Sequence, residues 1–97
     1  MTFTPKTPAF EKAVKDSRNL KAKPDNDELL ELYSLFKQGS QDPPFAEAPK
    51  PGMFDLTGKA KYNAWKQVED EGVSAKDAQE KYVKKVNALK EKYGFEG

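Results

Sequence analysis

Residues 51–65 read PGMFDLTGKAKYNAW, and this stretch predicts a turn followed directly by a helix. Pro51 and Gly52 are typical turn residues. Asp55 is of the type that caps a helix N-terminus, so the helix is expected to begin at Leu56. It is expected to end near Asp70, before Gly72.

One charged residue falls within the apolar arc of this expected helix. At about 100° per residue, Lys61 lies between Trp65 and Val68 on the helical wheel. An ammonium group on an apolar face needs either a path to water or a nearby anion. Two interpretations are therefore open: Lys61 reaches solvent or pairs with Glu69, or it faces a bound anion.

Composition limits the class of protein. The chain has 97 residues, no cysteine, no histidine and a net charge of +1. These numbers fit one domain, residues 1–97, with residues 1–6 as a loose N-terminus. They exclude disulfides, Cys/His metal sites and histidine-based catalysis. No more than two apolar residues occur in succession, so no membrane span is predicted and a cytoplasmic location is expected.

Three further helices are predicted from capping residues and apolar spacing. Thr7 and Pro8 mark the start of the first helix, which is expected to end within residues 21–24. Asp25 with Glu28 forms a capping box for the second. Ser74 caps a fourth helix whose core stripe is Ala75, Ala78, Tyr82, Val86, Leu89 and Tyr93. The predicted fold is an all-α four-helix bundle.

The second helix has an apolar arc of about 220°, wider than one core contact requires. Either the helix is covered on two sides, or one edge of it faces a ligand. That edge carries Leu30, Tyr33 and Lys37. The long segment 39–54 that follows is expected to be a packed overhand connection between helices that are not antiparallel neighbours, with ligand contact as an additional role.

Three blocks of sequence stand in this order: YSLFKQ at 33–38, PGMFDLTGKAKYNAW at 51–65 and AQEKY at 78–82. Together they resemble the acyl-CoA-binding protein family. The resemblance extends from about Phe10 to Tyr93. It implies a non-catalytic carrier and buffer of long-chain fatty acyl-CoA, with no cofactor, no metal and no catalytic residue. The family's usual Ala-Thr after the Lys-Gln pair is replaced by Gly39-Ser40, so loop contacts are not carried over.

The resemblance also implies nine ligand-binding residues. Around the 3′-phosphate and adenine it places Tyr33, Lys37, Lys61 and Tyr82. Arg18 stands where the family usually has lysine and is expected to keep a cationic role. Phe10 and Ala13 are expected near adenine, and Leu29 and Leu30 beside the acyl chain. Considered from residue type alone, Phe10 and Tyr82 are ordinary core aromatics and the two leucines are ordinary bundle contacts.

The expected partners follow from this interpretation. The protein is expected to be a monomer that binds long-chain acyl-CoA, makes at most transient membrane contact and serves acyl-CoA-using enzymes. Nucleic acid is not expected, because the charge is nearly balanced. The alternative is a small helical protein- or RNA-interaction module. An enzyme is disfavoured because no acid–base or nucleophilic pair is visible.

Overall fold

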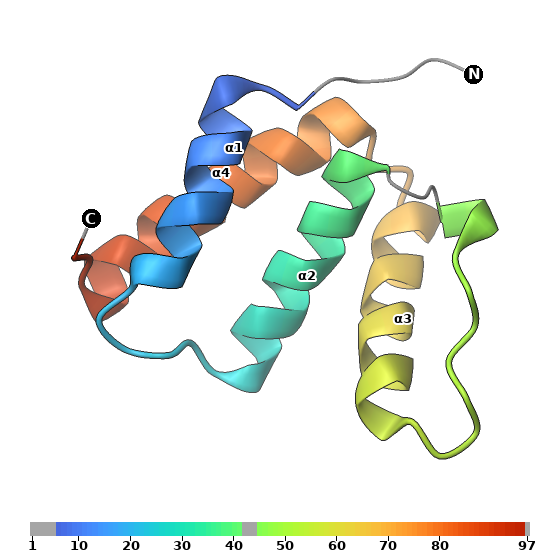
Figure 1. Ribbon diagram of the computed structural model, residues 1–97. Helices are drawn as coiled ribbons and strands as arrows, with labels where there is room; N and C mark the ends of the chain where they lie inside the picture. The colour runs from blue at the N-terminus through green and yellow to red at the C-terminus, as the bar shows by residue number, and fades with distance from the viewer. Residues whose placement is uncertain (1–5, 42–44, 97) are drawn as a thin grey trace.

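The computed structural model describes residues 6–41 and 45–96 of the chain. Four α-helices form the domain, which confirms the predicted all-α fold (Figure 1). They are α1 (Pro8–Asp16), α2 (Asn26–Ser40), α3 (Leu56–Asp70) and α4 (Ala75–Tyr93), with short 3₁₀ turns η1 (Ser17–Asn19) and η2 (Phe45–Glu47). Most of the expected loose N-terminus lies outside the described residues.

Each helix begins where the sequence predicts, because each has a side-chain cap. Thr7 accepts a hydrogen bond from the backbone of α1, and Ser74 does the same for α4. Asp25 and Glu28 form the predicted reciprocal capping box. The Asp55 carboxylate accepts from the Gly58 N–H at 2.8 Å. These caps satisfy N–H groups that have no partner within the helix.

Two helix ends differ from the prediction. α1 ends at Asp16 and continues as η1, where the Ser17 hydroxyl donates to the Val14 carbonyl at 2.7 Å. α2 continues through Gly39 instead of stopping there. A Cβ at Gly39 would lie 3.0 Å from the side chain of Gln79, whose amide donates to the Gly39 carbonyl. Gly39 therefore permits the close approach of α4 to α2.

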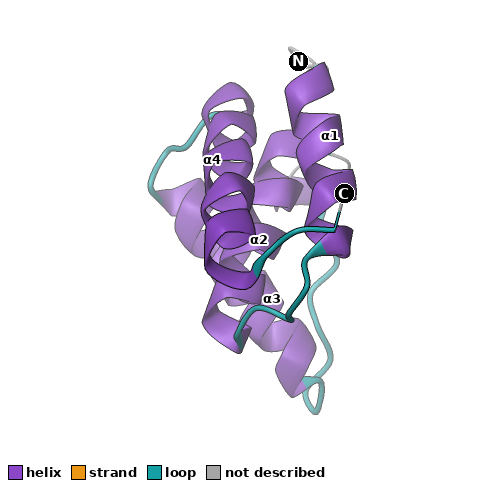
Figure 2. Ribbon diagram, turned by 90° about the vertical axis from the view of Figure 1, so that its left-hand side faces the viewer, coloured by secondary structure: helices purple, strands orange, loops and turns teal. Residues whose placement is uncertain are grey.

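Side-chain bonds between helices fix their directions. α1 and α4 are parallel, since the Gln79 amide oxygen accepts from the Thr7 N–H near their N-terminal ends, and Lys90 pairs with Asp16 near their C-terminal ends. α2 is antiparallel to α4 and parallel to α3 (Figure 1). The segment between α2 and α3 therefore returns along their whole length, as the predicted overhand connection requires. The molecule measures 35 × 34 × 19 Å, and Figure 2 shows it from its narrow side.

The core lies between α1, α2 and α4. The Phe10 ring is fully buried, with centroids 6.0 Å from Phe36 and 5.2 Å from Tyr82. The predicted stripe on α4 is buried at its four central positions. Apolar burial of this kind is the main stabilising term in a small domain. The buried apolar cluster is Phe10, Ala13, Leu32, Leu35, Ala78, Tyr82, Val86 and Leu89.

α3 is attached to the domain differently. Trp65 is the single buried residue among the 15 described residues of α3. Its indole N–H donates to the side-chain oxygen of Gln38 at 3.0 Å. The Gln38 amide nitrogen in turn donates to the Val73 carbonyl at 2.7 Å and to Glu69 at 2.8 Å. One tryptophan and one glutamine therefore provide the buried connection between α3 and α2.

Candidate ligand-binding site

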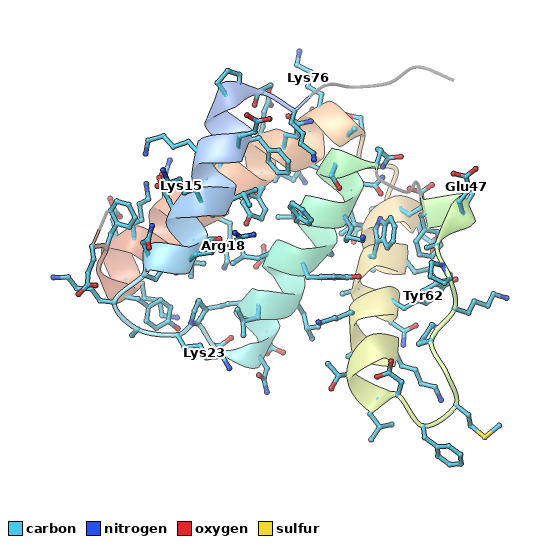
Figure 3. All side chains as sticks on the ribbon, in the orientation of Figure 1. Lys15, Arg18, Lys23, Glu47, Tyr62 and Lys76 are labelled. Atoms are coloured by element: carbon cyan, nitrogen blue, oxygen red, sulfur yellow. The ribbon has the colours of Figure 1, made fainter. Side chains whose placement is uncertain are left out.

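A groove lies between α1 and α2, and Tyr82 of α4 lines it. This α1–α2 groove has a volume of about 390 Å³. Arg18 projects between the two helices in Figure 3. The groove brings together five of the nine predicted site residues, which come from four different elements. They are Arg18, Leu29, Tyr33, Lys61 and Tyr82.

A second groove lies between α2, α3 and the connection that joins them. This loop groove also has a volume of about 390 Å³. Tyr33, Lys37 and Lys61 line it, together with Trp65 and residues 48–52 of the connection. Tyr62 of α3 lies on the side of the connection, where its ring packs against Phe45 at 5.0 Å (Figure 3).

The third groove is lined mainly by aliphatic side chains, and Lys61 is the one charged residue in its lining. It lies between α2 and the N-terminal half of α3 and has a volume of about 360 Å³. Leu29 and Leu30 line one wall, and Leu56 and Ala60 line the other. This apolar groove meets the other two grooves at Lys61, which lines all three.

Two cations of these grooves, Lys37 and Lys61, lie against aromatic rings. The Lys61 amine lies 5.3 Å from the centre of the Tyr33 ring, and the Lys37 amine 5.4 Å from that of Trp65. Glu69, the partner considered for Lys61, instead accepts from Gln38. Within residues 6–41 and 45–96 the ion pairs engage other lysines, and Arg18, Lys37 and Lys61 are in none of them. A cation held against a ring face keeps donors for an anionic ligand.

Tyr82 contributes a neutral hydroxyl to the α1–α2 groove. Burial raises the pKa of this phenol, and the hydrogen bond from Tyr82 to Ser17 and the charge of Arg18 oppose that rise. The hydroxyl donates to the Ser17 oxygen at 3.3 Å. The phenol stays protonated at neutral pH, and its one proton is donated to Ser17, so it can donate to a ligand only by leaving Ser17.

The arrangement is thus a group of cations and tyrosines at the junction of three grooves, one of them apolar. A model of the family described as "Acyl CoA binding protein" matches residues 7–86. The chain belongs to the acyl-CoA-binding protein family.

Individual relatives agree with this assignment. The chain is 49% identical to "Acyl-CoA-binding protein homolog 1" of Caenorhabditis elegans, over 91% of this chain and 98% of that protein. It is 47% identical to "Acyl-CoA-binding protein homolog" of Manduca sexta, over 82% and 86% of the two chains. Both matches extend over most of each relative.

Solved structures of the family have the same fold. The crystal structure of Oryza sativa Acyl-CoA-Binding Protein 2 matches with a TM-score of 0.74 and 34% identity, over 87% of this chain and 89% of that one. The structure of ACBP from Moniliophthora perniciosa matches with a TM-score of 0.76 and 36% identity, over 98% and 89%.

Not all residues suggested by the acyl-CoA-binding protein family lie at the grooves. Phe10 and Ala13 are buried in the core, beneath the α1–α2 groove, and line none of the three grooves. Their contact with adenine remains a prediction. Ser17, Pro24 and Phe36, which were not predicted, line the α1–α2 groove.

The connection between α2 and α3 supplies further groove residues that sequence reasoning missed. Residues 48–52 line the loop groove. The length of the connection indicated a function. Because its sequence departs from the family's pattern, no ligand-binding residue could be assigned in it.

In the described part of the chain, no cluster of His, Cys, Asp and Glu could hold a metal ion. No helix there is both long enough and apolar enough to cross a membrane.

Proposed function

We propose that this protein binds one long-chain fatty acyl-CoA, leaves the thioester intact, and thereby buffers and transports it. The observation that carries the proposal is the junction at Lys61. There, two grooves with cations and tyrosines meet a groove whose walls carry Leu29, Leu30 and Leu56. An amphiphilic ligand with phosphates at one end and an alkyl chain at the other fits this combination.

The cationic part of the site suits coenzyme A. Its 3′-phosphate and diphosphate both require donors, and Arg18, Lys37 and Lys61 provide charged donors from three different elements. Lysine binds phosphate as a point charge, and arginine adds a planar fork of donors. The tyrosines add neutral donors and ring faces for adenine. We assign Phe10 and Ala13 to the support of this surface from below.

The apolar groove suits the acyl chain. Each methylene removed from water contributes at most about 0.8 kcal/mol, and partial burial gives less. The groove is short, since it occupies the N-terminal half of α3 and the facing part of α2. Affinity should therefore rise with chain length and then reach a plateau.

Calorimetry with a series of ligands tests the proposal. Palmitoyl-CoA should bind with a stoichiometry of one, whereas free palmitate, coenzyme A and an oligonucleotide should bind weakly or not at all. Removing the 3′-phosphate from palmitoyl-CoA should weaken binding. Equal affinity for acyl chains of all lengths, tighter binding of the oligonucleotide, or release of free thiol during incubation would contradict the proposal. A cytoplasmic location, a monomeric state and service to acyl-CoA-using enzymes remain predictions.

A further inference from the structure

The turn that precedes α3 presents large apolar side chains to solvent. Met53, Phe54 and Leu56 are 75%, 91% and 77% exposed, and they are the exposed large hydrophobic residues of the described chain. Met53 and Phe54 are the two central residues of a turn closed by the Asp55 N–H, which donates to the Gly52 carbonyl at 3.1 Å. We call these three side chains the apolar turn.

The fold does not require apolar residues at these positions. Central turn positions are usually occupied by Gly, Asn, Asp, Ser or Pro, which suit the backbone and the solvent. At 91% exposure the Phe54 ring adds little to core burial, so keeping it in water is a cost without a folding gain. Large apolar side chains that are exposed within four successive residues mark a surface that meets a partner more often than single scattered ones do.

Hydrogen bonds fix the backbone of this turn relative to α3. The Lys59 amine donates to the Met53 carbonyl at 2.7 Å, across the turn from α3. The Asp55 side chain caps α3 at the same place. The apolar turn therefore projects from a helix end, and in Figure 1 this turn is the lowest point of the molecule.

The position of the apolar turn relates it to the proposed acyl site. Leu56 belongs both to the apolar turn and to the wall of the apolar groove, opposite Leu29 and Leu30. The exposed patch therefore continues into the groove. Basic side chains accompany the turn: the Lys59 amine bonds the Met53 carbonyl, and Lys50 precedes Met53 by three residues in the sequence.

We propose that the apolar turn is a shallow anchor for a phospholipid bilayer that contains anionic lipid. Phe54, Met53 and Leu56 would enter the boundary between headgroups and acyl chains, and the nearby lysines would meet lipid phosphates. Three side chains and a few charges give weak, reversible binding. The role of this anchor rests on the proposed function, because docking would bring the mouth of the apolar groove, the proposed acyl site, to the bilayer surface.

A labelling experiment tests insertion without any acyl-CoA. The chain has no cysteine, so Phe54→Cys can carry a single environment-sensitive nitrobenzoxadiazole probe. Asn87→Cys, an exposed position on α4 outside the apolar turn and the three grooves, is the matched control. With vesicles of phosphatidylcholine and phosphatidylserine, emission from the Phe54 probe should shift to the blue and be quenched by brominated lipid. The Asn87 probe should not respond.

A second pair of variants connects insertion to transport. Phe54→Asp should reduce the fraction of protein that floats with vesicles by roughly tenfold, the loss expected from keeping one phenyl ring out of an apolar phase. It should slow palmitoyl-CoA transfer from vesicles to protein. Asn87→Asp makes the same charge change and should alter neither flotation with vesicles nor the rate of palmitoyl-CoA transfer. Since flotation is measured without ligand, failure of palmitoyl-CoA binding alone would refute the proposed function and leave the anchor in place.

Three outcomes would overturn the anchor. The first is an equal response of the Phe54 and Asn87 probes to vesicles, or no response from either. The second is unchanged flotation of Phe54→Asp. The third is a Phe54 probe that shifts to the blue without vesicles as protein concentration rises, because the apolar turn would then contact a second copy of the chain.

Discussion

Replacing Gln38 with leucine tests how α3 is held. The Gln38 side chain is 4% exposed and bonds Trp65, Val73 and Glu69. Leucine has a similar size but cannot bond, so the buried Trp65 N–H loses its acceptor. A buried donor without a partner costs about 1–3 kcal/mol.

Losing the hydrogen bonds from Gln38 to Glu69 and to the Val73 carbonyl costs less free energy. Glu69 is exposed and Val73 is half-buried, so water can replace Gln38 at both. Net loss of such hydrogen bonds costs about 0.5–1.5 kcal/mol each, and burial of the leucine side chain offsets part of it. We expect Gln38→Leu to lower the free energy of unfolding by about 2–3 kcal/mol, which corresponds to a fall of roughly 10–20 °C in Tm.

Urea denaturation followed by tryptophan fluorescence provides the assay, since Trp65 is the only tryptophan in the chain. Gln67→Leu is the matched control, because Gln67 is an exposed residue of α3. It should change the free energy of unfolding by less than about 0.5 kcal/mol. If the two substitutions cost the same, the attachment of α3 through Gln38 is wrong.

Two other predictions concern the ligand and pH. Lys61→Ala should weaken palmitoyl-CoA binding tenfold or more, as expected for a charge-assisted hydrogen bond of about 1.5–3 kcal/mol. In the same calorimetry, Lys66→Ala, on the same helix but outside the grooves, should change the affinity less than about twofold. Equal losses for the two variants would refute the site. Hydrogen bonds from Tyr93 and Lys92 lower the pKa of Glu28 from 4.5 to about 2, so its stabilising effect is complete above pH 4.5 and lost as the pH falls toward 2. Urea midpoints measured over that range should therefore fall less steeply for Glu28→Gln than for wild type, whereas exposed Glu80→Gln should follow wild type; identical slopes for all three would contradict this.

Helix starts could be predicted from the sequence because their causes are local. Thr7, Asp25, Asp55 and Ser74 each accept a hydrogen bond from a backbone N–H three residues later, so a short window contains both partners. The end of α2 could not be predicted in this way. Gly39 resembles a helix stop in sequence, and its role depends on Gln79, which is forty residues away.

Buried side-chain amides were the main feature of the fold that the spacing of apolar residues in the sequence did not indicate. Gln38 and Gln79 are both almost fully buried, yet glutamine in a helix is ordinarily a surface residue. Their partners lie on other helices and on backbone carbonyls, which apolar periodicity does not reveal. In each case the amide joins α2 to another part of the bundle.

Some residues of the candidate site were predicted from the sequence, and others were not. Tyr33, Lys37 and Lys61 came from motifs, and they line the loop groove together. The sequence could place Lys61 within an apolar arc but could not show that three grooves meet there. The contribution of residues 48–52 depends on the path of a connection without regular periodicity.

The attachment of α3 has a consequence for how the molecule fluctuates. A helix with one buried side chain should detach from the domain at a lower free energy than complete unfolding requires. Amide hydrogens of α3 should therefore exchange with deuterium faster than those of α4, whose buried stripe belongs to the central core. A ligand that bridges Arg18 and Lys61 would bind only the attached state, so by mass action it should slow exchange in α3 more than elsewhere.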